Sequence, residues 1–313
     1  MHPLRVVFMG TPAFAVPSFH AVADSANIVA VVTQPDRPSG RGMALTPSPI
    51  KAAALVKSLP IYQPERIRKD PAFIQSISDL APDLIIVVAF GQILPNAILQ
   101  IPKYGCINIH ASLLPKFRGA APIQWSLICG EKITGVTSML MDVGMDTGPI
   151  LLTQSLSIHD LETADSLSSR LSQIGADLLA QTVGQLKGGG LHPIAQTAEG
   201  STLAPLLKKE DGFIRWNESA EAIFNRWRGV FVWPGTTTFN NQEAWKVTAL
   251  ELGDQEGSWG KPGEMLRVFE QGLDVAAEVG YIRIVRLRLA GGKEISPMEY
   301  AAGHSLQMGS LFR

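Results

Sequence analysis

A chain of 313 residues is longer than one hydrophobic core usually supports, which predicts two domains. Hydrophobic residues make up 46% of the sequence and charged residues 18%, a balance that excludes a disordered polymer. The 27 basic and 28 acidic residues nearly cancel, so any contact with nucleic acid must come from local patches.

Targeting signals and cysteine pairs are not evident in the sequence. The first ten residues pass into a strand-like apolar run without the features of a secretory signal. The longest apolar run, 84–90, is far shorter than the roughly 20 residues that span a bilayer. The spacing of Cys106 and Cys129 fits neither a zinc site nor a redox motif. We therefore expect a cytoplasmic protein with buried thiols and no membrane segment.

The first part of the chain alternates short Val- and Ile-rich runs with longer Ala-rich segments, which is typical of β-α-β units. Strands are expected near 4–9, 28–33, 84–88, 107–110, 134–141 and 150–156, and helices near 13–24, 50–58, 71–80, 123–128 and 163–186. Gly188, Gly189 and Gly190 end the last helix. The pattern predicts an α/β domain with a parallel sheet.

The β-α alternation stops after these glycines, in a polar stretch that reaches Asp211 and indicates a linker. A helix is expected near 219–228. Short alternating segments follow near 236–239, 245–250 and 281–289, separated by Gly-rich turns. We therefore expect a small β-barrel as the second domain.

Asn108 and His110 lie two residues apart on a predicted strand, so their side chains point to the same side. Open α/β sheets bind ligands at the carboxyl ends of their strands. Asn108 offers an amide donor for an oxyanion, and His110 offers a group that exchanges a proton near neutral pH. Spacing alone leaves open a structural pair that satisfies backbone carbonyls at the strand end.

A predicted turn at 141–149 carries two carboxylates, Asp142 and Asp146, among glycines. The triplet Asp146-Thr147-Gly148 also occurs in aspartic proteases, but their chemistry needs a second such motif, which the chain lacks. An Asx-turn that caps loop amides is the structural alternative for Asp146. The pattern predicts the turn and leaves its chemistry open.

Three longer runs can be compared with known families: Asn108-Ile109-His110-Ala111-Ser112-Leu113-Leu114-Pro115, Arg118-Gly119-Ala120-Ala121-Pro122-Ile123-Gln124 and Gly144-Met145-Asp146-Thr147-Gly148. Together they resemble the folate-dependent formyltransferases. The runs 33–42 and 47–51 favour the members of this family that formylate the methionine carried on initiator tRNA. The resemblance extends over nearly the whole chain, in order.

The resemblance implies an α/β fold class, with a Rossmann-like, mostly parallel sheet and a smaller OB-like open β-barrel. With the organisation above, the expected parts are a formyl-folate-binding catalytic domain at 1–190, a linker at 191–208 and a tRNA-contacting barrel at 209–313. The backbone expected to hold the pterin is that of Val87, Val88, Ala89, Phe90, Gly91, Ser112, Leu113, Leu114 and Pro115.

The resemblance also implies the chemistry. The α-amine of methionine on initiator methionyl-tRNA attacks the formyl carbon of 10-formyltetrahydrofolate, in a monomeric enzyme without a metal. Asn108 and His110 would stabilise the oxyanion that forms. Asp146 would orient His110, or a water, so that the proton of the amine moves toward the departing folate nitrogen.

Six basic residues are candidates for tRNA contacts. Within the long polar loop 34–44, Arg41 is the main candidate and Arg37 the second, because the corresponding loop of the family inserts at the tRNA acceptor end. Lys208 and Lys209 lie where the linker meets the second domain, and Arg286 and Arg288 share one face of a predicted strand. Solvated surface charges are the alternative for both pairs.

The sequence leaves three main alternatives open. The same catalytic residues could formylate an amino sugar nucleotide, or could hydrolyse formyl-folate with water as the acceptor. A purine precursor, glycinamide ribonucleotide, is less compatible with the second domain. From a different class, the chain could be a non-catalytic scaffold that binds tRNA. The chain departs from the family at Phe231-Val232, where Asn-Pro is usual, which concerns the geometry of the barrel rather than the chemistry.

Overall fold

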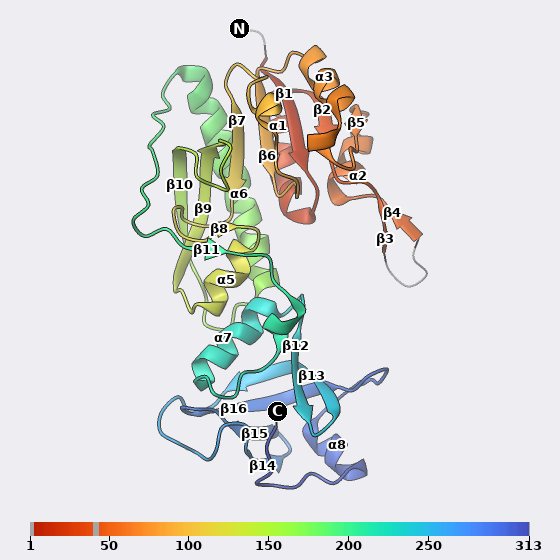
Figure 1. Cartoon of the computed structure of the whole chain (residues 1–313), viewed down its shortest axis with the longest axis vertical. Coiled ribbons are helices and arrows are strands. Elements are labelled where there is room, and N and C mark those ends of the chain that lie inside the picture. The colour runs from red at the N-terminus through yellow and green to blue at the C-terminus, as the bar shows by residue number, and fades with distance from the viewer. Residues whose placement is uncertain (1–2, 40–43, 313) are drawn as a thin grey trace. The chain divides into compact units, whose positions relative to one another are not determined.

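The computed structural model describes residues 3–39 and 44–312. The chain divides into two compact units (Figure 1). The first consists of Met1–Pro122, Ile133–Ser157 and Ser168–Ala204, and the second of Ile123–Lys132, Ile158–Leu167 and Pro205–Arg313. Two short segments that the sequence analysis assigned to the first domain, 123–132 and 158–167, thus pack with the second unit.

A seven-stranded sheet in the order β10-β9-β7-β6-β1-β2-β5 forms the centre of the first unit. Its strands are β1 (Arg5–Gly10), β2 (Asn27–Val32), β5 (Ile61–Tyr62), β6 (Leu84–Val88), β7 (Cys106–His110), β9 (Ile133–Leu140) and β10 (Ile150–Ser157). The strands from β7 to β5 are parallel, whereas β9 is antiparallel to β7 and β10 to β9. The strand order reverses between β1 and β6, and ligands of open α/β sheets bind in the crevice at such a reversal.

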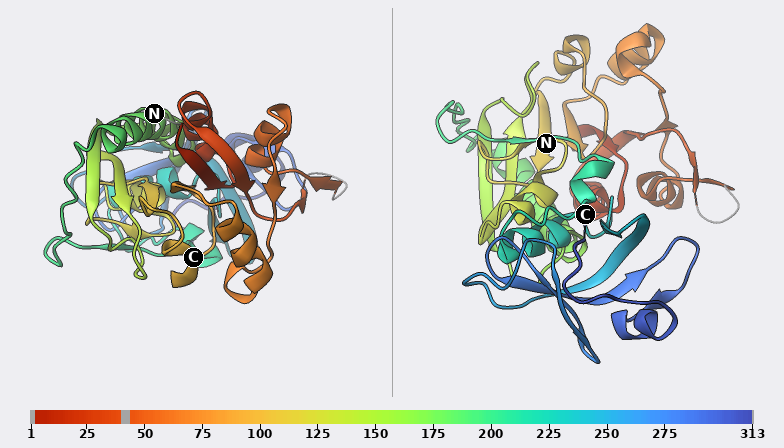
Figure 2. Two further views of the ribbon diagram at one scale, coloured as in Figure 1. Left: turned by 90° about the horizontal axis from the view of Figure 1, so that it is seen from above. Right: turned by 60° about the horizontal axis from the view of Figure 1, so that its bottom comes forward.

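Helices cover both faces of this sheet. They are η1 (Ala13–Ala15), α1 (Val16–Ala23), α2 (Pro49–Val56), η2 (Ile67–Lys69), α3 (Pro71–Asp79), α4 (Asn96–Leu99) and α6 (Ala164–Gly188), of which the last begins in the second unit. Seen from above, α1 and α6 lie on one face of the sheet and α3 and α4 on the other (Figure 2). None of the described helices is long and apolar enough to cross a membrane.

The starts of α2 and α3 follow directly from local sequence. Each helix has proline at its first position, where a backbone N–H is not required. The Ser48 hydroxyl caps α2 by accepting a hydrogen bond from the N–H of Lys51 at 3.0 Å. The Asp70 carboxylate caps α3 in the same way, from the N–H of Phe73 at 2.9 Å.

The Val- and Ile-rich runs form the buried strands of the first unit. Every residue of β6 and all but the first residue of β1 are buried. Val7, Ile85 and Ile77 belong to one hydrophobic cluster, in which β1, β6 and α3 pack together. The predicted strands at 4–9 and 84–88 are therefore confirmed.

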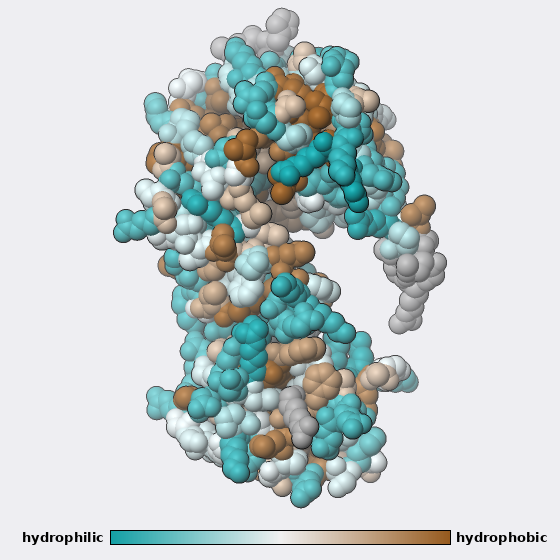
Figure 3. Space-filling view, viewed as in Figure 1, coloured by the Kyte–Doolittle hydropathy of each residue, from teal (hydrophilic) through white to brown (hydrophobic). Residues whose placement is uncertain are grey.

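Two small sheets complete the first unit. β3 (Arg37–Ser39) and β4 (Ala44–Thr46) are antiparallel, and they stand out from the body of the unit (Figure 1, Figure 3). β8 (Arg118–Gly119) pairs in parallel with β11 (Leu203–Ala204). This second pairing brings the chain that follows α6 beside the chain that follows β7.

The second unit contains an antiparallel sheet in the order β12-β13-β16-β15-β14, with β17 paired to β16. Its elements are α5 (Pro122–Ile128), η3 (Lys209–Gly212), α7 (Ala220–Val230), β12 (Thr236–Asn240), β13 (Glu243–Leu252), β14 (Met265–Phe269), β15 (Gly272–Ala276), β16 (Tyr281–Arg288), β17 (Glu294–Ile295) and α8 (Pro297–Gly303). The fully buried Trp245 packs edge-on against Tyr300 and Phe312 at the centre of its core. The predicted fold class, a mostly parallel α/β sheet followed by a smaller antiparallel β domain, is confirmed.

β15 was not among the predicted strands, because Asp274 interrupts its apolar pattern. This carboxylate is only 1% exposed. It accepts hydrogen bonds from Nε of Arg267 and Nε of Arg283, each at 2.7 Å. The two guanidinium groups compensate the buried charge, so that a strand with a central aspartate can lie inside the sheet.

The two cysteines differ in exposure and therefore in expected reactivity. Cys106 is buried as predicted, and burial raises its pKa to about 12, whereas Cys129 is exposed and the prediction of a buried thiol is wrong there. Near neutral pH we expect iodoacetamide to alkylate Cys129 and to spare Cys106, because the thiolate is the nucleophile and Cys106 stays protonated. Peptide mass spectrometry of native and unfolded protein measures this. Rapid labelling of Cys106 in the native protein would contradict the expectation.

Candidate active site

Asn108 and His110 lie at the carboxyl end of β7, which has neighbouring strands on both sides. Asn108 is in register with Val87 of β6 and Met139 of β9. His110 faces Thr137 of β9 in the same ladder. The two side chains are therefore held by a strand whose backbone is paired on both sides, one strand beyond the reversal of strand order between β1 and β6.

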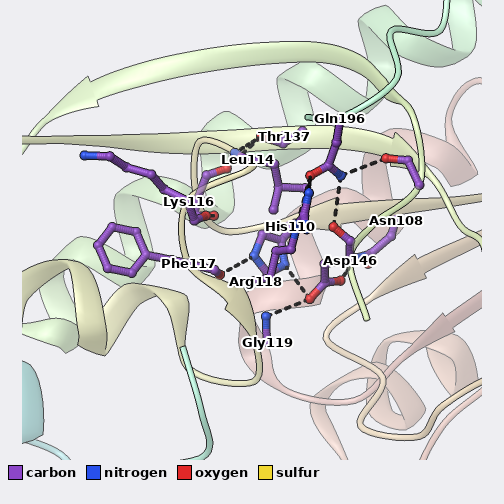
Figure 4. A network of polar contacts seen from close by, with 12 residues as sticks. Asn108, His110, Leu114, Lys116, Phe117, Arg118, Gly119, Thr137, Asp146 and Gln196 are labelled. Carbon is purple, nitrogen blue, oxygen red and sulfur yellow. Dashed lines mark hydrogen bonds and ion pairs between the residues drawn. The ribbon is translucent and has the colours of Figure 1, made fainter. Parts of the chain in front are cut away.

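Asp146, in the loop between β9 and β10, meets both of these residues (Figure 4). Its Oδ1 accepts a long hydrogen bond of 3.4 Å from Nδ2 of Asn108. Its Oδ2 lies 3.6 Å from Nδ1 of His110 and accepts a hydrogen bond of 2.8 Å from the N–H of Gly119. The structure thus brings together the three residues that the sequence analysis singled out as catalytic.

The His110 ring is fixed by a partner at each nitrogen. Its Nε2 lies 2.9 Å from the carbonyl oxygen of Phe117, and the side chain is only 6% exposed. A carbonyl can only accept a hydrogen bond, so Nε2 carries a proton. Nδ1 is then the nitrogen that faces the Asp146 carboxylate and remains available for proton exchange.

The Asx-turn of this loop belongs to Asp142 and not to Asp146. Oδ1 of Asp142 accepts hydrogen bonds from the N–H of Gly144 at 3.0 Å and from the hydroxyl of Thr147 at 2.8 Å. A Cβ on Gly148 would lie 1.9 Å from the carbonyl oxygen of Leu140, so glycine is required there. The structural alternative weighed for Asp146 is therefore realised by its neighbour, which leaves the Asp146 carboxylate to the site.

Gln196 joins the same network, although sequence reasoning missed it. Its Nε2 donates to the carbonyl oxygens of Asp146 and Gly148, at 2.9 and 2.7 Å. Its Oε1 accepts from Nε and Nη2 of Arg118, at 3.1 and 2.7 Å. Gln196 lies in the polar stretch that was predicted to be a linker, where no periodicity marks a residue. The one hint in the sequence was Arg118, which lies in one of the three runs compared above. A guanidinium group needs a hydrogen-bond acceptor, but the sequence does not say which residue supplies it.

The nine residues expected to hold the pterin lie at the end of β6 and in the two loops that leave β6 and β7 at the same edge of the sheet. Val87, Val88 and Phe90 are buried, whereas Ala89 and Gly91 have positive φ angles of 47° and 86° and turn the chain sharply. The carbonyl oxygen of Phe90 accepts hydrogen bonds from two side chains, those of Thr11 at 3.0 Å and Gln34 at 3.2 Å.

The second loop, from Ser112 to Pro115, is held by hydrogen bonds to Thr137 of β9 and within the loop. The hydroxyl of Thr137 donates to the carbonyl oxygen of Ser112 at 2.7 Å and accepts from the N–H of Leu114 at 3.1 Å. The Ser112 hydroxyl donates to the carbonyl oxygen of Lys116 at 2.6 Å. Leu113 and Pro115, the remaining residues of this loop, are partly buried. Both loops are therefore anchored by side chains from other segments of the chain, namely Thr11 and Gln34 for the first and Thr137 for the second.

The six basic residues expected to contact tRNA are distributed over both units. Arg37 is exposed on β3, and Arg41 lies outside the described residues. Lys208 and Lys209 are exposed at the start of η3.

The two arginines on β16 are both exposed, and each has an acidic neighbour. Arg286 lies 3.5 Å from Glu299, and Arg288 lies 3.8 Å from Glu294. Their positive charge is thus partly balanced within the second unit. Among the described residues, no group of three or more His, Cys, Asp or Glu side chains could hold a metal ion.

Known proteins match the chain over almost its full length. A formyl transferase family model matches residues 4–183, and a model of the formyl transferase C-terminal domain matches residues 206–305. The methionyl-tRNA formyltransferase of Citrifermentans bemidjiense is 47% identical and aligns over 99% of this chain and 97% of its own. That of Pelobacter propionicus is 48% identical, again over 99% and 97% of the two chains.

Solved structures of low sequence identity share the fold. An N-formyltransferase from Helicobacter canadensis, in complex with folinic acid and dTDP-3-aminofucose, has a TM-score of 0.68 at 17% identity, over 91% of this chain and 99% of its own. HypX from Aquifex aeolicus, in complex with tetrahydrofolic acid, has a TM-score of 0.61 at 13% identity, over 96% and 47%. From the two matched domains and the full-length relatives, this chain belongs to the formyl transferase family.

Proposed function

We propose that this chain transfers the formyl group of 10-formyltetrahydrofolate to the α-amine of methionine on initiator methionyl-tRNA. The geometric observation that carries the proposal is that Asn108, His110 and Asp146 lie together at the carboxyl end of β7. Relatives that are 47 and 48% identical over nearly the whole chain, and are named methionyl-tRNA formyltransferase, support the choice of acceptor.

In this proposal, Asn108 and His110 stabilise the oxygen that becomes negative when the amine attacks the formyl carbon. His110 does so through Nδ1 once that nitrogen carries a proton, because Nε2 donates to the carbonyl oxygen of Phe117. The bond from Asn108 to Asp146 is long, at 3.4 Å, and the amide has a second N–H, so Asn108 can donate to a new acceptor without losing its position. Donors that are held in place before the reaction stabilise developing charge without a cost of reorganisation.

We assign proton transfer to Nδ1 of His110, the ring nitrogen that faces Asp146. The attacking amine must lose a proton, and the departing folate nitrogen must gain one. Nδ1 of His110 and the Asp146 carboxylate lie 3.6 Å apart, a separation at which the carboxylate can orient the ring or a water between substrates. No step of this scheme requires a metal ion.

The residues at the crevice fit a formyl-folate donor. A pterin carries hydrogen-bond donors and acceptors around a flat ring, which backbone groups at a strand end can match. The segments Val87 to Gly91 and Ser112 to Pro115 offer such groups, and hydrogen bonds from Thr11 and Thr137 hold their backbones. We assign the donor to this crevice.

The remaining assignments concern domains and partners. We assign residues 1–190 to catalysis, 191–208 to a linker whose Gln196 also contacts the catalytic loop, and 209–313 to an OB-like domain that contacts tRNA. The phosphate-contacting residues are proposed to be Arg37, Arg41, Lys208, Lys209, Arg286 and Arg288. The enzyme is proposed to act as a monomer in the cytoplasm, where aminoacylated tRNA is made and used.

The test is the transfer of labelled formyl from 10-formyltetrahydrofolate to competing acceptors. We expect label on methionyl initiator tRNA, and none on free methionine, dTDP-amino sugars or glycinamide ribonucleotide. Label on a sugar nucleotide would overturn the choice of acceptor, and release of free formate would indicate hydrolysis. Stoichiometric binding of tRNA without turnover would indicate a scaffold.

A further inference from the structure

We propose that Gln196 is a positioning residue that holds Asp146 in its active conformation. This inference rests on the proposed function, because it assigns Gln196 a role in the same reaction. Gln196 is expected to touch neither substrate. It acts through the backbone of the loop that presents the Asp146 carboxylate to Asn108 and His110.

The first observation is the backbone of Asp146, which has a φ of 54°. This left-handed conformation is uncommon for residues with a side chain, and aspartate is one of the few that adopt it, usually with local hydrogen bonds to hold it. Such a conformation persists only where the surrounding contacts fix it, and it is found most often where a side chain must be presented in one direction. The loop therefore needs a group that keeps Asp146 from relaxing.

Gln196 is placed to supply that restraint. It donates to the carbonyl oxygens of Asp146 and Gly148, which are two residues apart, and so it fixes peptide groups on both sides of Thr147. The other strong contact of Asp146, from the N–H of Gly119, reaches only the carboxylate. The N–H of Gly119 orients the side chain, whereas Gln196 holds the backbone carbonyl (Figure 4).

Arg118 determines which way the Gln196 amide lies. A guanidinium group only donates hydrogen bonds, so the amide oxygen must face Arg118 and the NH2 group must face the two carbonyls. Arg118 and Gly119 are consecutive residues of β8. One short strand therefore supports Asp146 twice, through the Gly119 N–H on the carboxylate and through Arg118 on Gln196.

Two substitutions separate positioning from simple packing. Gln196→Leu removes every polar contact at nearly constant size. Gln196→Glu keeps the size and strengthens the pairing with Arg118, but it places an acceptor opposite two carbonyl oxygens. We expect both variants to lower kcat on the order of a hundredfold, the usual consequence of a small misplacement of a catalytic group, with unchanged KM for 10-formyltetrahydrofolate.

A stability control and a double substitution complete the test. Asp70→Ala removes the cap of α3 in the same unit, so it should lower thermal stability while kcat is retained. In an Asp146→Ala background, Gln196→Leu should cause no further loss of kcat, because the group that it positions is gone.

Three results would overturn the inference. They are wild-type kcat in Gln196→Glu, additive losses in the double variant, and a loss of kcat in Gln196→Leu no larger than in Asp70→Ala. Formyl transfer by the unmodified enzyme is measured in the same assay, so a failure of the proposed function is visible separately. If the unmodified enzyme transfers formyl and the variants do so equally well, only the role of Gln196 is lost.

Discussion

Replacing Asp146 with alanine is expected to lower kcat for formyl transfer on the order of a thousandfold, within the range for loss of a group that assists proton transfer. The carboxylate faces Nδ1 of His110, accepts from Asn108 and is held by the N–H of Gly119. Its removal frees the histidine ring on the side where the proton must move. Single-turnover transfer of labelled formyl to methionyl initiator tRNA measures the effect on chemistry without product release.

The same loop provides a matched control. Asp142→Asn changes an exposed carboxylate four residues away. That carboxylate accepts hydrogen bonds from Gly144 and Thr147 within the turn. An amide oxygen can accept the same bonds, so kcat should remain at the level of the unmodified enzyme. Equal losses in both variants would mean that negative charge in the loop matters rather than the position of Asp146, and would contradict the assigned role.

Asn108→Ala is expected to lower kcat on the order of a hundredfold, which is typical for the loss of one oxyanion donor. The effect should be on kcat more than on KM for the donor, because the negative oxygen exists only in the transition state and the intermediate that follows. Steady-state rates over a range of 10-formyltetrahydrofolate concentrations, at saturating tRNA, separate the two constants.

Ser138→Ala is the control for Asn108→Ala. Ser138 lies on β9, next to β7, and its hydroxyl accepts from Thr182, which keeps a second acceptor in the carbonyl oxygen of Leu178. We therefore expect a small change in stability and an unchanged kcat. Full activity of Asn108→Ala would remove this residue from the oxyanion site and leave His110 alone in that role.

Local patterns predicted the part of the site that lies on one strand. A spacing of two residues places Asn108 and His110 on the same side of a strand, and their common contact with Asp146 agrees with this. The approach of Asp146 could not be derived in the same way, since it depends on how a loop folds back over β7. Only the resemblance to a family connected the two segments beforehand.

The turn sequence does not determine which of its two aspartates, Asp142 or Asp146, caps the turn and which contributes its carboxylate to the site. Both carboxylates lie among glycines, and either could cap the turn. The choice is made by contacts from distant segments, namely Gly119 on the Asp146 side chain and Gln196 on its backbone. Such contacts have no periodicity in the sequence, which is also why Gln196 escaped prediction.

Asn108 and His110 lie in a paired strand, whereas Asp146 lies in a loop. This difference determines which part of the active site opens first. A strand with neighbours on both sides opens only when much of the sheet opens with it, whereas a loop held by a few side-chain contacts can open locally. The free energy that protects the catalytic arrangement is then smaller than the free energy that protects the fold. The enzyme would be inactivated by local opening of one turn while its sheet remained native.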